Sequence, residues 1–403
     1  MIDALFTVTL LDLFIGGGGR LVEIGPATLR MVLFALSLCC TLYMGLLGRR
    51  QDGQVLALAL VALYLMVHIP AFILGTLRGH PLPDMLGEIQ PTLYFLAAPF
   101  FAMVLSSPAM VRRTASLVVV AGATLAISYL LVLVGLAIGV IDFAPLYTAM
   151  STSGEFFFRG ESFFFYKGFL YLGIAIIFLV AVRGKHWRSL LILIAGALIL
   201  TLTRGFVLST SVALLLLLAA TGRWRSIAYA AIPIGAAAIL VFVQLPSLDE
   251  GFLDQRDISN SQRLDDVSYI VENATVGTIL MGEGFGSLIN ERLNIENSFL
   301  WAFWKLGLIG VAFWTLPLAM SVYYYVRVPK DESSHRLALG FLFGTVLVYV
   351  QTQTNPYLNN PIGLSFVLLS VFSLRTLSRQ RFVKTRLEPV PARHRPVHRI
   401  PAL

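Results

Sequence analysis

The sequence predicts an all-α, polytopic integral membrane protein with about 12 transmembrane helices and one larger periplasmic loop that contains short helices. Of the 403 residues, 57% are hydrophobic and only 13% are charged, whereas soluble globular proteins carry about 25% charged residues. The mean hydropathy is +0.80. Many apolar stretches are long enough to cross a hydrocarbon core of about 30 Å as helices, in which every backbone group is satisfied internally. Lipid is therefore the main solvent.

The expected spans follow the apolar stretches in order. They cover residues 2–17, 26–47, 54–77, 89–107, 115–141, 164–182, 188–203, 205–222, 226–245, 298–325, 336–354 and 361–376. The first stretch is weakly apolar, and the seventh and eighth are tightly joined, so the pattern fits eleven or twelve crossings. The N-terminus has no basic segment and no small-residue cleavage site, so we expect the first stretch to stay as a helix.

The basic residues set the expected orientation. Of the 30 lysines and arginines, 20 lie in alternate connections and in the C-terminal tail, and the positive-inside rule assigns these segments to the cytoplasm. Most acidic residues fall in the other connections. We therefore expect cytoplasmic N- and C-termini in a bacterial inner membrane and an active site that faces the periplasm. The net charge of +8 reflects topology, so no nucleic-acid partner is expected.

Three regions follow from this layout. Residues 1–187 form the N-terminal transmembrane helices, residues 188–376 form the C-terminal ones with the periplasmic loop 246–297, and residues 377–403 form a basic tail with too few apolar residues to pack. Cys39 and Cys40 are adjacent in an apolar run, so they build neither a disulfide framework nor a metal site. No metal and no cofactor are expected.

The loop 246–297 is the one long polar connection, and such loops are typically functional or disordered. Apolar residues recur at helical spacing over 260–280, which predicts an amphipathic helix that lies over the membrane face. Arg263 stands in the first turn of this helix. It either pairs locally with Asp265 or Asp266 or serves a substrate.

Glycines and arginine supply the next candidates. Residues 281–286 read Met-Gly-Glu-Gly-Phe-Gly; these glycines form a tight turn or leave the N–H groups around Gly284 and Gly286 open to an anion. Arg204 lies between two spans at the predicted periplasmic end, where positive charge is uncommon. Arg204 either extends its guanidinium to the membrane–water interface or uses the planar guanidinium to bind a phosphate with two hydrogen bonds.

The start of the span at 298–325 carries three more candidates. Glu296 and Asn297 precede the helix, where a carboxylate is also favoured by the helix dipole alone. Lys305 falls more than two turns inside the span and needs a partner or water, so it is a functional candidate. The polar stretch from Gln351 to Pro361, with Asn355 and Tyr357, is either an ordinary turn or a sugar-binding loop.

These motifs occur together in a characteristic order: Arg204 after Thr-x-Thr, Arg263 before the glycine-rich 282–286, and then Glu296-Asn297 followed by Leu306-Gly307-Leu308-Ile309-Gly310. In this order they resemble the superfamily of O-antigen ligases and Wzy-type O-antigen polymerases. The resemblance covers roughly residues 188–376. It implies a metal-independent, inverting, membrane-embedded glycosyltransferase that uses glycans linked to undecaprenyl diphosphate.

The resemblance also implies roles for the residues. Arg204 and Arg263 hold the diphosphate and stabilise the charge that develops as it leaves, and Glu296 acts on the acceptor hydroxyl. At this position the ligases typically carry a His-Asn pair, whereas this chain has Glu296-Asn297. This difference favours a polymerase. A buried carboxylate can serve as the base if its pKa is raised.

The leading hypothesis is thus a polymerase of O-antigen, capsule or exopolysaccharide repeat units. Its alternatives are an O-antigen ligase that transfers polymer to lipid A-core, and a lipid-linked oligosaccharide flippase or polysaccharide exporter. The expected partners are the undecaprenyl-diphosphate-linked oligosaccharide donor and acceptor and membrane lipids, with a polysaccharide chain-length regulator as a candidate.

Overall fold

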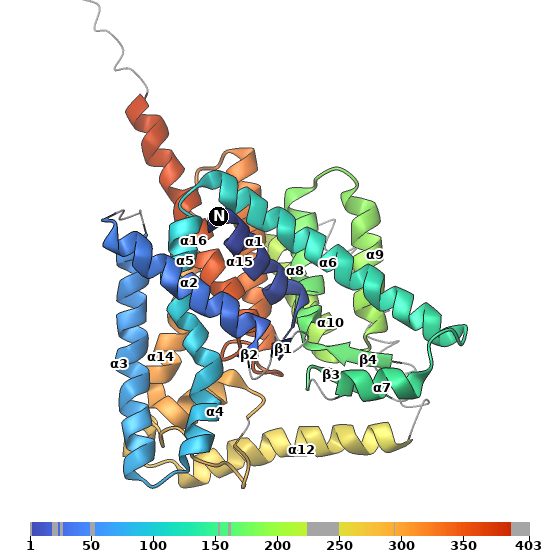
Figure 1. Cartoon of the computed structure of the whole chain (residues 1–403), viewed down its shortest axis with the longest axis vertical. Helices are drawn as coiled ribbons and strands as arrows, with labels where there is room; N and C mark the ends of the chain where they lie inside the picture. The colour runs from blue at the N-terminus through green and yellow to red at the C-terminus, as the bar shows by residue number, and fades with distance from the viewer. Residues whose placement is uncertain are drawn as a thin grey trace, which may run out of the picture.

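The computed structural model describes residues 2–17, 23–24, 27–48, 53–151, 154–159, 163–223, 250–293 and 295–387. The described chain is predominantly helical, as predicted, with two small antiparallel hairpins that were not expected (Figure 1). Six of its helices are long and apolar enough to cross a membrane: Leu29–Leu46, Gln54–Leu77, Pro108–Ala137, Ser298–Arg327, Glu332–Gln351 and Pro361–Arg379.

The N-terminal half begins with a short helix and ends in a hairpin. Its elements are α1 (Ile2–Ile15), β1 (Glu23–Ile24), β2 (Ala27–Thr28), α2 (Leu29–Leu46), α3 (Gln54–Leu77), α4 (Leu82–Thr92), η1 (Leu93–Ala97), α5 (Ala98–Val104), α6 (Pro108–Ala137), α7 (Phe143–Ser151), β3 (Phe156–Arg159) and β4 (Phe163–Tyr166). The strands β3 and β4 pair with Phe156 opposite Tyr166, so aromatic rings line both strands.

The C-terminal half contains helices of up to 30 residues. Its elements are η2 (Lys167–Phe169), α8 (Leu170–Val182), α9 (Trp187–Leu200), α10 (Arg204–Ala220), α12 (Glu250–Asn273), α13 (Val276–Met281), α14 (Ser298–Arg327), α15 (Glu332–Gln351) and α16 (Pro361–Leu387). Helix α8 is buried on all sides because α6, α9, α10 and α15 surround it. A uniformly apolar helix is stable only in such a central position or in lipid.

Several predicted spans take a different form. The span predicted at 164–182 begins as strand β4 and becomes helical only after η2. The span predicted at 89–107 is divided into α4, η1 and α5, with Pro91 and Pro99 at the breaks, where proline removes a helical donor. The weak first stretch forms a helix of 14 residues, shorter than the roughly 20 that a crossing needs.

The remaining differences concern the end of the chain and the ninth stretch. Helix α16 continues beyond residue 376, the predicted end of the span, to Leu387. The extension contains helix-forming Leu, Arg, Gln and Lys and stops shortly before Pro389. The predicted basic tail therefore begins as a helix. The span predicted at 226–245 lies outside the described residues.

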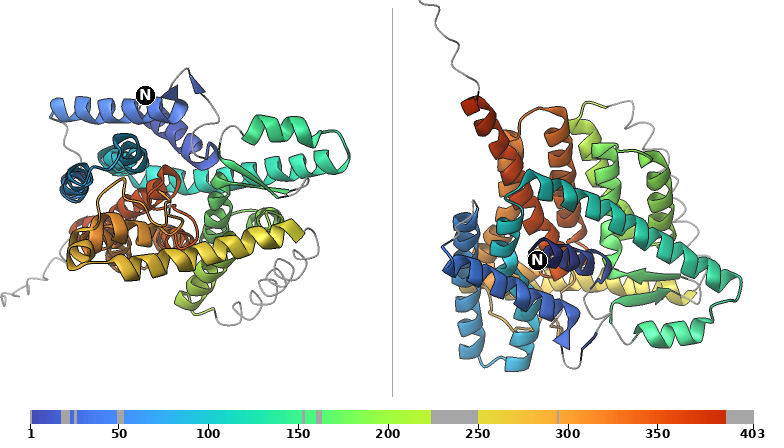
Figure 2. Two further views of the ribbon diagram at one scale, coloured as in Figure 1. Left: turned by 90° about the horizontal axis from the view of Figure 1, so that it is seen from below. Right: turned by 45° about the horizontal axis from the view of Figure 1, so that its top comes forward.

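The two ends of the helix bundle differ in chemistry. Helix α16 projects from one end of the bundle (Figure 1), and α15 begins near that end. Arg336 lies near the start of α15, whereas Arg183 and Arg223 follow the ends of α8 and α10. Burial, together with the charges of Arg183 and Arg336, lowers the pKa of Arg223, so these arginines are electrostatic neighbours. Helix α12 crosses the opposite end of the bundle (Figure 2). We call this opposite end the α12 end.

Candidate functional site

Arg263 and Glu296 form an ion pair at the α12 end. Arg263 projects from α12, and its Nη2 and Nε atoms lie 2.6 Å and 2.8 Å from Oε2 of Glu296, just before α14. The two side chains are 38% and 44% exposed. The local alternative for Arg263, a pair with Asp265 or Asp266, is wrong, because Arg263 pairs with Glu296 and Asp266 pairs with Arg292 at 2.5 Å. Two residues predicted to act together therefore touch, although 33 positions separate them.

Both Arg263 contacts go to a single oxygen of Glu296. Within the described part of the chain, the other oxygen, Oε1, accepts no hydrogen bond. It is therefore available to accept a hydrogen bond from a ligand hydroxyl. Arg263 likewise keeps guanidinium donors beyond the two that contact Glu296, since arginine carries five N–H groups.

Asn297 fixes the segment that carries Glu296. It is the N-cap of α14, and its Oδ1 accepts from the backbone N–H groups of Phe299 at 2.8 Å and Leu300 at 3.2 Å. Such capping satisfies donors that a helix leaves open at its start. The Nδ2 of Asn297 also donates to Oε1 of Gln353 at 3.0 Å. Asn297 thus orients the backbone next to Glu296.

The polar loop 351–361 is bound to the start of α14. Ser298 N donates to Thr352 O at 3.1 Å, the hydroxyls of Ser298 and Thr352 lie 2.8 Å apart, and Ser298 Oγ donates to Asn359 Oδ1 at 2.8 Å. All these contacts are buried or partly buried. These hydrogen bonds therefore join the loop to the segment that carries Glu296 at the α12 end.

Arg204 stands on another side of the same loop. It begins α10, and its neighbour Gly205 lies so close to the side chains of Gln351 and Thr354 that an added Cβ would be 2.9 Å from each. Ser209, one turn further along α10, donates to Gln351 Oε1 at 2.8 Å. The structure therefore places Arg204 and Glu296 on two elements that contact the same loop.

Asn355 and Tyr357 lie within this loop. The Nδ2 of Asn355 donates to Thr354 Oγ1 at 3.4 Å, and the side chain is half-buried. Tyr357 is buried, and its hydroxyl donates to the backbone oxygen of Lys167 at 3.0 Å. Burial, with the Glu155 carboxylate nearby, raises the pKa of Tyr357 well above its ordinary value. Tyr357 thus stays a neutral donor, and this contact joins the loop to η2.

Lys305 is fully buried and has a partner that the sequence did not identify. Its Nζ lies 2.8 Å from Oε1 of Glu88 in α4 and also donates to the backbone oxygen of Ser287. The second oxygen of Glu88 accepts from Gly286 N at 2.6 Å. This cluster joins α4, the glycine-rich turn and α14. It is separate from the Arg263–Glu296 pair.

The glycine motifs at 282–286 and 306–310 pack against each other. Helix α14 is kinked at Gly307, and an added Cβ there would lie 2.3 Å from Leu280 O. An added Cβ at Gly282 would lie 2.3 Å from the carbonyl carbon of Lys305. The kink leaves the carbonyls of Trp304 and Lys305 open, and they accept from residues 283 and 284. The two motifs therefore meet as one packing unit.

The N–H groups of this turn all have acceptors inside the protein. Gly284 N donates to Lys305 O at 3.1 Å, Phe285 N to Ala71 O at 3.3 Å, and Gly286 N to Glu88. The predicted tight turn is confirmed. The predicted anion-binding role of Gly284 and Gly286 finds no open backbone donor in this arrangement.

Replacing Lys305 with methionine is expected to destabilise the fold by about 3–5 kcal/mol, because it leaves the buried Glu88 carboxylate without its counter-charge. The double variant Lys305→Met, Glu88→Gln should recover most of this loss, since the amide still accepts from Gly286. Thermal unfolding of the purified protein in detergent measures the effect. Lys330→Met, at an exposed loop position, is the matched control, and a Lys305→Met protein as stable as wild type would contradict the pairing.

Three residues with contacts at these sites were not predicted from the sequence: Glu88, Gln353 and Thr352. Glu88 was detectable in principle, because Lys305 needs a carboxylate and Glu88 is an acidic residue at the edge of a predicted span. Gln353 and Thr352 belong to the polar loop, and their contacts depend on its folded shape. Within the described ranges, no three His, Cys, Asp or Glu side chains gather in a group that could hold a metal ion.

No family model matches the chain. The chain is 29% identical over 380 residues to the O-antigen polymerase of Shigella flexneri, and this likeness covers 92% of the chain and 95% of that protein. It confirms the resemblance that was predicted from the motifs and extends it into the N-terminal half.

Proposed function

We propose that this protein is a multi-pass inner-membrane polymerase that joins oligosaccharide repeat units linked to undecaprenyl diphosphate, in the synthesis of O-antigen or a related polysaccharide. The observation that carries the proposal is the likeness to an O-antigen polymerase along almost the whole of both chains. The Arg263–Glu296 pair, positioned by the start of α14, supplies the chemistry.

The proposed reaction is a single displacement at an anomeric carbon. The oxygen of an acceptor hydroxyl forms the new bond to this carbon as the bond to the diphosphate oxygen breaks, and the diphosphate leaves with the electron pair. The hydroxyl proton passes to Oε1 of Glu296, the oxygen that Arg263 leaves open. One displacement inverts the anomeric configuration.

The two arginines act on the leaving group in this proposal. Arg204 and the remaining N–H donors of Arg263 bind the diphosphate, because a planar guanidinium matches phosphate oxygens with two parallel hydrogen bonds. Arg263 thereby bridges the base and the leaving group. Asn355 and the other amides of the loop 351–361 offer hydrogen bonds to sugar hydroxyls nearby.

We propose that the α12 end faces the periplasm and that both termini lie in the cytoplasm. The neighbouring Arg183, Arg223 and Arg336 at the opposite end support this orientation, since basic residues accumulate on the cytoplasmic side. The lipid-linked substrate would then meet Arg204 and Glu296 at the outer interface.

A deletion strain tests the function against its two alternatives. Without the polymerase, cells are expected to attach a single repeat unit to lipid A-core and to make no long chains. Loss of all attached sugar, with free polymer retained, would identify a ligase. Accumulation of lipid-linked repeat units on the cytoplasmic side would identify a flippase. Gel analysis of lipopolysaccharide and of the lipid-linked pool separates these outcomes.

The proposed chemistry needs no metal, so the purified protein is expected to keep its polymerising activity in excess EDTA. The two arginines perform the charge stabilisation that a divalent cation supplies elsewhere. The measurement is the rate of polymer formation from lipid-linked repeat units before and after chelation. Recovery of a lost rate by added Mg²⁺ or Mn²⁺ would contradict the prediction.

A further inference from the structure

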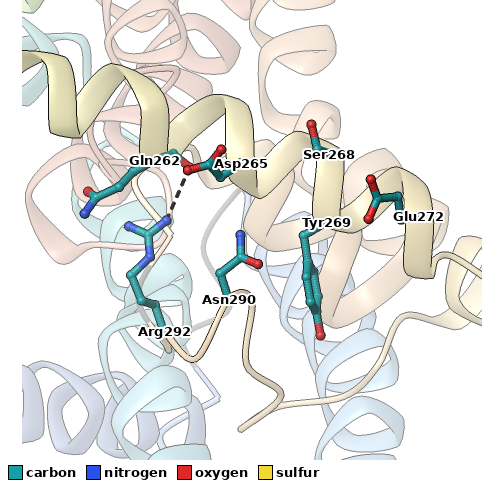
Figure 3. A pocket seen from close by; sticks show the side chains of 7 residues that line it. All are labelled: Gln262, Asp265, Ser268, Tyr269, Glu272, Asn290 and Arg292. Carbon is teal, nitrogen blue, oxygen red and sulfur yellow. Dashed lines mark hydrogen bonds between the residues drawn. The ribbon is translucent and has the colours of Figure 1, made fainter.

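An open polar groove runs along α12, the helix that carries Arg263. Its volume is about 490 Å³, which falls in the range of small-molecule sites. Figure 3 shows the side chains that line it, from α12 on one side and from the following loop on the other. The lining residues are Gln262, Asp265, Ser268, Tyr269, Glu272, Asn290 and Arg292.

The groove follows one face of α12. Gln262, Asp265, Tyr269 and Glu272 recur at spacings of three and four, so they form a continuous stripe. From Gln262 to Glu272 this stripe spans about 15 Å, at about 1.5 Å per residue. Such a length suits a short chain of several sugar units better than a single small molecule.

The opposite face of α12 is apolar and exposed. Leu264 is 70% exposed and Val271 is 73% exposed, and Val267 lies between them on the same face. An interfacial helix directs such a face toward lipid and its polar face toward water. The polar stripe therefore faces the aqueous side, where a growing saccharide would emerge.

Most polar side chains of the groove are available for hydrogen bonds to a ligand. In the described structure, the side chains of Gln262, Asp265, Ser268, Glu272 and Asn290 make no hydrogen bond. Together they offer hydroxyl, amide and carboxylate groups, which donate to and accept from vicinal sugar hydroxyls. The Tyr269 ring, fixed at 5.6 Å from the Trp304 ring, adds a rigid surface for the apolar face of a sugar.

The net negative charge of the groove favours neutral saccharides over anionic ones. Among the described residues that line the groove, Arg292 is the only cation, and it is already paired with Asp266 and donates to Gln262 O at 3.3 Å. Asp265 and Glu272 have no described counter-charge, so the groove is negative on balance. It repels uronic acids and other anionic sugars and accepts neutral, hydroxyl-rich ones.

The groove and the proposed reaction centre are carried by the same two segments of the chain. Gln262 directly precedes Arg263, and Arg292 lies four positions before Glu296. We infer that this groove binds the saccharide chain as a neutral oligosaccharide segment, and holds it beside the Arg263–Glu296 pair between successive additions. The inference rests on the proposed polymerase function, and it assigns to the outer face of α12 a role apart from the chemistry.

A tryptophan that fills the groove tests this inference. Ser268→Trp places a bulky ring among the lining residues, whereas Val267→Trp places the same ring on the opposite, exposed apolar face of α12 and serves as the matched control. The probe is the polymer released by mild acid from the producing cells. Binding is measured by equilibrium dialysis with purified protein, so it needs no turnover and no lipid diphosphate.

We expect Ser268→Trp to weaken polymer binding at least tenfold (about 1.4 kcal/mol), and Val267→Trp to bind like wild type. Polymer whose primary hydroxyls have been oxidised to carboxylates should bind wild type more weakly than the native polymer. Equal binding by Ser268→Trp and wild type would overturn the groove assignment, and so would absence of binding by wild type. Tighter binding of the oxidised polymer would overturn the assignment to neutral sugars.

The same variants separate this inference from the proposed function. In the deletion strain, Ser268→Trp is expected to join repeat units but to give shorter chains, while Val267→Trp gives chains of normal length. If wild type makes no polymer, the proposed function fails, whereas the dialysis result still reports on the groove. If Ser268→Trp makes normal chains, the groove does not hold the growing saccharide.

Discussion

Arg204→Lys is expected to lower the rate of polymer formation by about 10²–10³-fold, the range found when one donor to a developing negative charge is removed from an active site. Lysine keeps the positive charge but loses the planar fork that binds two phosphate oxygens at once. The variant should still fold, because Gly205 and Ser209 make the contacts that tie α10 to the loop 351–361. The measurement is the initial rate with purified, lipid-linked repeat units.

A matched control exists at the same end of the bundle. Arg78 forms an ion pair with Glu283, and its side chain is 35% exposed. Arg78→Lys preserves a partly exposed pair of this kind, whose contribution to stability is small. This control should retain nearly the wild-type rate and the wild-type amount of protein in the membrane. Wild-type polymer formation by Arg204→Lys would remove Arg204 from the proposed diphosphate site.

The long helices were predictable because they follow from the apolar composition of continuous stretches of sequence. A stretch such as 54–77 contains almost only apolar residues, so lipid or a helical core is its only stable environment, and α3 begins and ends at those residues. The divided helix α4–η1–α5 and strand β4 were mispredicted. Hydropathy is an average over a window of residues. It therefore detects neither the helix breaks at prolines nor the pairing of the aromatic strands β3 and β4.

The candidate site was predictable as a set of residues but not as a set of contacts. A lysine deep in a span requires a partner, yet nothing local in the sequence connects Lys305 in α14 to Glu88 in α4, because all the elements from η1 to α13 lie between them along the chain. Local spacing instead favoured Asp265 or Asp266 as the partner of Arg263. The fold decides otherwise, because Asp266 is buried on the face of α12 that meets Arg292.

The contact between the glycine motifs at 282–286 and 306–310 could not be predicted from either motif alone. Each motif alone predicts only a turn or a flexible point in a helix. Their contact explains why the chain carries both, since Gly282 and Gly307 allow two backbones to approach more closely than any side chain permits. The motif order thus points to a packing unit that positions the start of α14.

Glu296→Gln is expected to slow polymer formation by about 10²–10⁴-fold, the usual contribution of a general base. The amide keeps the size of the side chain and can still accept from Arg263, but it cannot take up the hydroxyl proton. Because both partners of the Arg263–Glu296 pair are more than a third exposed, loss of the pair should cost little stability. The rate with purified enzyme therefore reports on chemistry, and unfolding in detergent should be unchanged.

Glu291→Gln provides the control, because Glu291 is an exposed acid in the same loop and should tolerate the identical change at the wild-type rate. Glu296→His then separates the two roles that the ion pair allows. Histidine supplies a base without a negative charge for Arg263, so a base role predicts more activity for His than for Gln. If Glu296 only positions Arg263, His should be no better than Gln, since neither neutral side chain holds the guanidinium as the carboxylate does.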